Sequence, residues 1–149
     1  NTLLRDEGIG IHVLEALRAQ LPGDDSLSLI DGGTLSFTLA TEIESTDRLV
    51  VIDAAQLGEA PGAVRCFTGQ EMDNFLGSCK RSVHEVGLLD LLDIARLTQT
   101  LPAQRALVGI QPASVEWGEE PTDAVAAAIP VAVEKICELL DLWRTEAAA

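Results

Sequence analysis

The runs Leu49–Ile52 and Arg105–Ile110 constrain the fold of this 149-residue chain more than any other feature of its sequence. Leu49–Ile52 is continuously apolar and Arg105–Ile110 is nearly so, as expected for strands that are buried on both faces. Helical patterns alternate with these strands along the chain, and helices on both sides of a sheet bury such strands. The sequence therefore predicts an α/β fold, a three-layer α/β/α sandwich on a mostly parallel, twisted sheet.

The other elements follow from hydrophobic periodicity and from the residues that end them. Residues 7–20 place apolar side chains on one helical stripe, which Pro22 ends. Residues 26–30 are a short apolar run before an Asp and are predicted to form a strand. Ala63–Thr68 is short and closely connected, which predicts an antiparallel edge strand. The remaining helices are predicted over 35–44, 84–98 and 122–145. Pro130 is expected to kink the last of these three helices.

Composition excludes several classes of partner. The formal net charge is −14 at pH 7, with a pI near 4.3, which argues against nucleic acid and anionic membranes as partners. No apolar run approaches the roughly 20 residues that a membrane-spanning helix needs. The 3 cysteines form no C-x-x-C pair, which indicates a reducing compartment. We therefore expect a single cytoplasmic, monomeric domain over residues 1–149.

Polar side chains at the ends of the predicted elements are the candidate site residues. Asp6 and Glu7 form a carboxylate pair at the start of the first predicted helix. The alternative is that they are only a charged first turn, since the helix dipole by itself favours acids at this position. Asp31 and Asp53 each end an apolar run, and ligands in open α/β sheets bind beyond the carboxyl ends of strands. Capping of the following turn is the alternative for each Asp, and a surface or capping role is the alternative for His84. Glu7, Asp53 and His84 together would suit a divalent ion such as zinc or nickel.

Other chemistries have little support in the sequence. There is no Gly-x-Ser-x-Gly elbow, and no Ser or Cys is paired with His84 in the manner of a catalytic triad. G-x-G-x-x-G and P-loop patterns are also missing. We interpret His12 as structural, and Cys66 and Cys137 as packed apolar groups. Cys79, just before His84, has no sequence signal that would make it reactive.

Five short motifs occur in order along the chain. They are Asn1-x-Leu3-x-x-Asp6-Glu7-x-x-Gly10, Asp31-Gly32-Gly33-Thr34, Val51-Ile52-Asp53-Ala54, His84-x-x-Gly87-Leu88 and Gly109-Ile110-Gln111-Pro112. In order and spacing they resemble the maturation endopeptidases of nickel-iron hydrogenases, over essentially the whole chain. Members of that family begin with a β-strand that ends just before the Asn. The resemblance therefore implies that the first strand of the sheet is missing from this chain.

The resemblance also implies a function. Such enzymes are nickel-dependent, aspartyl-type processing endopeptidases that remove the C-terminal extension of the hydrogenase large-subunit precursor after nickel insertion. Their residues matching Glu7, Asp53 and His84 bind a metal, thought to mimic the nickel that the precursor carries. Other divalent ions such as zinc or cadmium can occupy these ligands in vitro. The residue matching Asp31 is implicated in activity.

The longest irregular segments are predicted at 68–83 and 111–121, beside the candidate site. Long loops next to a site usually recognise partners, although a solvated connector is the alternative. The side chains predicted to touch the precursor are Phe75, Lys80, Arg81 and Trp117.

Two other classes of function stay open. One is a non-enzymatic metal-binding or chaperone domain that docks on a metalloprotein precursor. The other, a phosphorylase-like hydrolase, rests on analogy of fold alone. Only a processing endopeptidase would shorten a nickel-loaded precursor, so a cleavage assay separates it from the docking domain.

Overall fold

The computed structural model describes residues 5–32, 37–78, 83–113 and 118–148, without the side chains of residues 5, 37, 38 and 83–86. The chain divides into two compact units, which are considered separately. The first comprises Asn1–Asp31, Ile52–Cys66 and Val108–Ala149, and the second comprises Gly32–Val51 and Phe67–Leu107. The single domain predicted for residues 1–149 stays a prediction.

The sheet of the described residues has three strands in the order β1-β3-β2. They are β1 (Arg48–Ala54), β2 (Val64–Thr68) and β3 (Gln104–Ile110). β1 and β3 are parallel, since β3 starts with a hydrogen bond to Asp47, just before β1, and its last carbonyl accepts the amide of Ala55, just after β1. β2 is antiparallel and lies at an edge. The predicted α/β class and the antiparallel edge strand are therefore confirmed, with β3 buried along most of its length.

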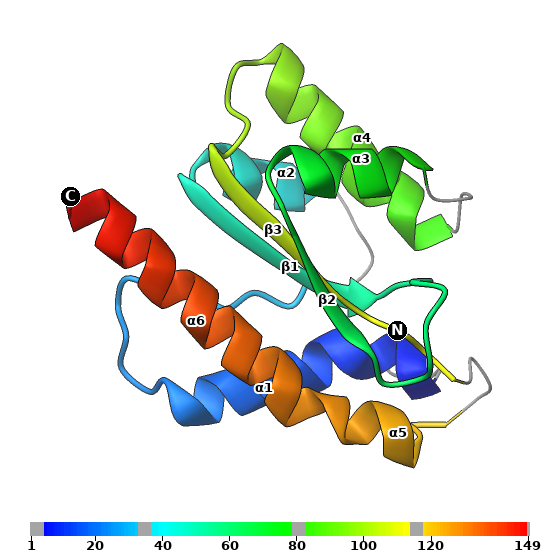
Figure 1. The fold of residues 1–149 in the computed structure, drawn as a ribbon. Helices are drawn as coiled ribbons and strands as arrows, with labels where there is room; N and C mark the ends of the chain where they lie inside the picture. The colour runs from blue at the N-terminus through cyan, green and yellow to red at the C-terminus, as the bar shows by residue number, and fades with distance from the viewer. Residues whose placement is uncertain (1–4, 33–36, 79–82, 114–117, 149) are drawn as a thin grey trace. The chain divides into compact units, whose positions relative to one another are not determined.

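The first unit buries the apolar stripes of two long helices. α1 (Ile9–Gln20) follows a 3-10 turn, η1 (Arg5–Gly8), and lies beside α6 (Ala128–Ala148) (Figure 1). Spacings of three and four residues put the buried side chains of each helix on one face. The buried residues are Ile9, Val13, Leu14 and Leu17 of α1, and Ala128, Ala132, Val133, Ile136, Leu139 and Trp143 of α6. No helix among the described residues is long and apolar enough to cross a membrane.

The helix predicted over 122–145 is interrupted before its proline, not at it. A four-residue helix, α5 (Asp123–Ala126), ends at Ala127, and α6 begins one residue later. Pro130 has no amide hydrogen, and its ring would clash with the carbonyl four residues earlier, which belongs to Ala126. The helix therefore breaks at Ala127, because a continuous helix would bring the ring of Pro130 against the carbonyl of Ala126. In α6 itself Pro130 occupies the first turn, where an amide hydrogen needs no helical acceptor.

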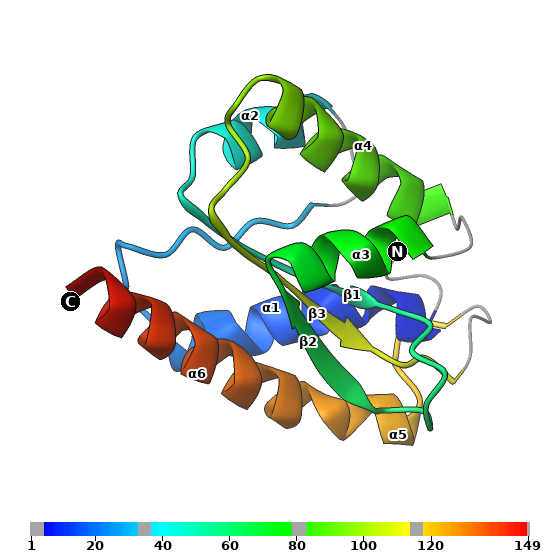
Figure 2. The ribbon, with the colours of Figure 1, turned by 45° about the horizontal axis from the view of Figure 1, so that its top comes forward.

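The second unit is built on three helices, of which one replaces a predicted loop. α2 (Phe37–Glu44) and α4 (Val83–Leu97) match their predictions closely, and α4 packs beside α3 (Gln70–Ser78) (Figure 2). The prediction of an irregular segment over 68–83 is wrong because Met72 and Leu76, four residues apart, bury one face of α3. One apolar cluster of this unit consists of Met72, Leu76, Leu88, Leu92 and Leu107.

A carboxylate in this unit holds two arginines. Asp73 of α3 accepts hydrogen bonds from Arg105 at 3.0 and 2.6 Å, and one from Arg96 at 3.0 Å. The side chains of Asp73 and Arg105 are only 10% and 12% exposed, so water screens this pair weakly. The bidentate contact with Arg105, and secondarily the charges of both arginines, lower the pKa of Asp73.

Replacing Asp73 by Asn should make stability less dependent on acid pH. Because the pKa of Asp73 is lower in the folded protein, its contribution is complete above the ordinary value near 3.8 and is lost as pH falls through the folded value. At neutral pH we expect Asp73→Asn to lower the free energy of unfolding by about 1–3 kcal/mol, because a hydrogen-bonded charge is removed. Urea unfolding at several pH values should show the difference shrinking below pH ~4. A difference that stays constant down to pH ~2 would contradict this prediction.

The predicted strand at residues 26–30 is wrong. Residues 27–32 have no regular secondary structure, and the segment is not a member of the three-stranded sheet. An apolar run becomes a strand only when another strand satisfies its backbone groups, and local sequence cannot supply that partner. Asp31 therefore follows an irregular segment in the described structure.

Candidate functional site

Gly10, in the first turn of α1, lies directly against the end of β1. A Cβ atom built on Gly10 would lie 2.5 Å from the carbonyl oxygen of Ile52 and 3.9 Å from the Cα atom of Asp53. Only a residue without a side chain permits this approach of helix and strand. The start of α1 is thereby held at the carboxyl end of β1, the edge at which open α/β sheets bind ligands.

Glu7 and Asp53 are the two predicted ligands that the structure brings to this edge. Glu7 lies in η1, three residues before Gly10, and η1 is followed directly by α1. The Oε2 atom of Glu7 is buried. Oδ1 of Asp53 accepts the amide of Ala54 at 2.8 Å, which orients that carboxylate. Carboxylates gathered at one edge can serve as ligands for a divalent cation.

Asp6 has a different role from Glu7, although the sequence presents the two as a pair. The side chain of Asp6 is 0% exposed. Its Oδ2 accepts the amide of Ala113 at 2.7 Å, and its Oδ1 accepts the amide of Thr122 at 2.8 Å. The Thr122 hydroxyl lies 3.1 and 3.0 Å from the same two oxygens. Asp6 thus joins η1 to both ends of the segment that connects β3 with α5.

Gln111, just after β3, holds the loop between β1 and β2. Its side-chain carbonyl accepts the amide of Leu57 at 2.6 Å, and its side-chain amide donates to Gln56 at 3.0 Å. Its backbone carbonyl accepts the amide of Gly62 at 2.9 Å. Gly62 has φ +86° and packs on the backbone of Ala124 in α5, which a side chain would prevent. The loops of the first unit are therefore connected to one another by hydrogen bonds and close packing.

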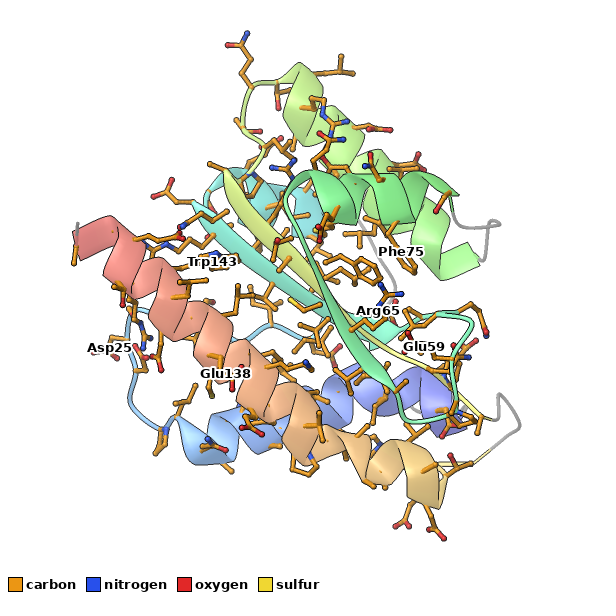
Figure 3. All side chains as sticks on the ribbon, viewed as in Figure 1. Asp25, Glu59, Arg65, Phe75, Glu138 and Trp143 are labelled. Atoms are coloured by element: carbon orange, nitrogen blue, oxygen red, sulfur yellow. The ribbon has the colours of Figure 1, made fainter. Side chains whose placement is uncertain are left out.

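The surface of that loop carries an ion pair between Arg65 of β2 and Glu59. Figure 3 shows the two side chains next to each other, with 3.7 Å between Arg65 Nη1 and Glu59 Oε1. Arg65 is exposed. Exposed pairs of this kind contribute less than about 1 kcal/mol, so hydrogen bonds and packing determine the position of the loop.

His84, the third predicted ligand, is the residue after Val83 at the start of α4 in the second unit, and its side chain lies outside the described residues. Among the side chains that are described, no group of three or more His, Cys, Asp or Glu residues is arranged to hold a metal ion. The joining of His84 to Glu7 and Asp53 therefore stays a prediction.

Of the other predicted site residues, the structure describes Asp31 and Phe75. Asp31 is exposed, in the first unit. Phe75 stacks on Phe67 with 4.2 Å between ring centroids, and it packs against the apolar cluster of the second unit. Its predicted contact with the precursor stays a prediction. Lys80, Arg81 and Trp117, like Cys79, lie outside the described residues.

The remaining histidine and cysteines are consistent with structural roles. Nε2 of His12, in α1, is buried and has no hydrogen-bond partner among the described residues. Cys66 and Cys137 are half-buried. Burial, the largest cause, and the nearby Asp141 raise the pKa of Cys137, which disfavours its nucleophilic thiolate form.

Sequence reasoning missed Asp6 and Gln111 as residues that hold the site together. Both belong to motifs of the resemblance, but their partners are far away in the sequence, since Asp6 and Ala113 are 107 positions apart. The usable signal was an acid and an amide at the ends of elements. That signal indicates a polar anchor without indicating its partner.

Replacing Gly10 by Ala should destabilise the protein although alanine is the better helix former. Alanine in a helix is favoured over glycine by about 1 kcal/mol. Here its Cβ would meet the Ile52 carbonyl, so α1 must shift away from β1. We expect the thermal midpoint to fall and precursor cleavage to slow. Gly77→Ala in α3, where nothing lies within 4 Å of the new Cβ, is the control and should be neutral or stabilising. A Gly10→Ala protein at least as stable as the Gly77→Ala protein would contradict the close packing.

An open mixed sheet with an Asp at the carboxyl end of a parallel strand places the chain among the α/β proteins, in which ligands commonly bind at that edge. Comparisons with known proteins identify the class more closely. The family model of the hydrogenase maturation proteases matches residues 11–139. The hydrogenase expression/formation protein HoxM of Cupriavidus necator is 35% identical, over 96% of this chain and 71% of its own length.

Two Escherichia coli comparisons agree. The hydrogenase 2 maturation protease is 33% identical, over 94% of this chain and 85% of its own length. The solved structure of the hydrogenase maturating endopeptidase HybD superposes with a TM-score of 0.86 at 34% identity, covering 95% of this chain and 87% of the other. The chain belongs to the hydrogenase maturation protease family. It is therefore a hydrolase of the peptidase class.

Proposed function

We propose that this protein is a cytoplasmic endopeptidase that removes the C-terminal extension of a nickel-iron hydrogenase large-subunit precursor after nickel insertion. Its membership of the hydrogenase maturation protease family supports both the reaction and the class of substrate. Within the chain, one observation carries the proposal. Gly10 packs against the Ile52 carbonyl, so the turn that bears Glu7 meets the end of the strand that bears Asp53.

Nickel enters this reaction as part of the substrate. Glu7, Asp53 and His84 are the proposed ligands, and two carboxylates with an imidazole suit a borderline divalent ion such as nickel, zinc or cadmium. The burial of Glu7 Oε2 fits this role because a cation compensates the cost of burying a carboxylate. Nickel bound by these residues would anchor the tail of the precursor beside the protease.

Asp31 is the proposed catalytic carboxylate, in keeping with an aspartyl-type endopeptidase. In peptide hydrolysis, water attacks the scissile carbonyl carbon, the C–N bond breaks and the leaving amine gains a proton. A carboxylate can accept the proton of the attacking water and return it to the amine. The exposure of Asp31 supports this assignment, since a bound peptide could reach it.

Recognition of the rest of the precursor is assigned to Phe75, Lys80, Arg81 and Trp117, with the protease acting as a monomer. The chain has 24 Asp and Glu residues against 10 Lys and Arg, so an adjacent cationic pair such as Lys80 and Arg81 is unusual in this acidic sequence. Cationic side chains beside a site favour anionic segments of a partner.

Cleavage of purified precursor with and without nickel tests the proposal. We expect the nickel-loaded precursor to be shortened at its C-terminus and the nickel-free precursor to stay intact, as followed by mass spectrometry. Binding of the loaded precursor without cleavage would instead indicate a non-enzymatic docking domain. Equal cleavage of both forms would overturn the role of nickel in recognition and leave the peptidase activity standing.

A further inference from the structure

Asp6 is buried more completely than its position at a helix start requires. An acid that only interacts favourably with the helix dipole can stay in solvent near the first turn. Asp6 is instead 0% exposed, and both of its carboxylate oxygens accept hydrogen bonds from Ala113 and Thr122. Burial of a carboxylate is costly unless it is fully hydrogen-bonded, so these contacts compensate for its desolvation.

The geometry of η1 links the direction of Asp6 to that of Glu7. In a 3-10 helix, with three residues per turn, neighbouring side chains point about 120° apart and residues three apart overlap. Fixing Asp6 on Ala113 and Thr122 therefore fixes the direction in which Glu7 points. The turn is held on its other side as well, because η1 is followed directly by α1, whose Gly10 packs against the backbone of Ile52 and Asp53. Asp6 and Gly10 together determine the rotation of the turn.

We propose that Asp6 is a positioning residue for nickel recognition, which acts by holding the carboxylate of Glu7 toward Asp53. This inference rests on the proposed function, in which Glu7 is a ligand of the nickel in the precursor. Asp6 does not itself contact nickel or the scissile peptide in this assignment. Residues that orient a metal ligand commonly change metal affinity 10–100-fold when they are replaced.

Asp6→Asn is the most informative variant because it keeps the shape of the side chain. One of its two terminal atoms becomes an NH₂ group, which cannot accept the amide of Ala113 or Thr122 that faces it. We expect the affinity for free Ni²⁺, measured by isothermal titration calorimetry, to fall at least 10-fold. For cleavage of loaded precursor, KM should rise more than kcat falls, because the chemical step does not pass through Asp6.

Two matched controls in α6 distinguish a specific effect on nickel binding from a general loss of stability. Val133→Ala and Ile136→Val remove buried methyl groups from the same unit, far along the chain from the site. They should lower the thermal midpoint without changing the affinity for Ni²⁺ or KM. If Asp6→Asn binds Ni²⁺ with the same affinity as the wild type and the two α6 controls, Asp6 is a structural residue only and the inference fails. If the wild type itself neither binds Ni²⁺ nor distinguishes loaded from nickel-free precursor, the proposed function fails and the inference falls with it.

Discussion

Replacing Asp53 by Asn is expected to reduce cleavage of the nickel-loaded precursor about 100-fold or more while the protein stays folded. Asparagine keeps the oxygen that accepts the Ala54 amide, which lies 2.8 Å from Asp53 Oδ1, so the local backbone should be preserved. It removes the negative charge, and a neutral amide is a much weaker ligand for a borderline divalent ion. His84→Ala should behave in the same way. Cleavage rates over a range of precursor concentrations, together with circular dichroism of each variant, measure both effects.

Asp47→Asn is the matched control for this experiment. Asp47 precedes β1, at the opposite end of the strand from Asp53, and its side chain is exposed. The same chemical change there should leave cleavage within about twofold of the wild type, as surface substitutions usually do. Full activity of Asp53→Asn, or an equal loss in the Asp47 control, would contradict the role of Asp53 as a ligand.

Asp31→Asn should differ from the ligand variants in kind. If Asp31 transfers a proton near the scissile bond, its loss slows cleavage while binding of the nickel-loaded precursor is largely retained. Binding and cleavage must therefore be measured separately for each variant. Undiminished cleavage by Asp31→Asn would show that Asp31 has no catalytic role.

Replacing Asp6 by Ala is expected to lower the free energy of unfolding by about 3 kcal/mol or more. The substitution leaves the buried amides of Ala113 and Thr122 without their acceptor, and each unsatisfied buried group costs about 1–3 kcal/mol. For a chain of this size, 1 kcal/mol shifts the thermal midpoint by about 2–4 °C, so a fall of about 6–12 °C should be seen. Urea unfolding and a thermal scan measure this change.

Asp25→Ala provides the comparison for Asp6. Asp25, labelled in Figure 3, is an exposed acid in the turn after α1. Asp25→Ala removes the same chemical group from a solvent-exposed position and should change the free energy of unfolding by less than about 0.5 kcal/mol. Similar losses for the two variants would mean that Asp6 is no more important to the fold than a surface acid.

Much of the secondary structure was predictable because its signals are local. The apolar stripe of α1, the buried run of β3 and the brevity of β2 each lie within one element, and each prediction is confirmed. Pro130 also correctly indicated a broken helix, and the sterics of the carbonyl four residues earlier explain the position of the break. The short apolar face of α3 was present in the sequence, but two buried positions are a weak periodic signal.

The sequence by itself determined the α/β class, most of the helices and, through the spacing of five motifs, the family of this protein. Only the tertiary structure decided the different roles of Asp6 and Glu7, which are adjacent acids with the same local pattern. Asp6 is buried on the amides of Ala113 and Thr122, while Glu7 lies in the turn that leads to Gly10 and the end of β1. The same limit applies to residues 26–30, which have the composition of a strand without a place in the described sheet. In each case the deciding factor is a hydrogen-bond partner distant in sequence, and hydrophobic periodicity contains no information about that partner.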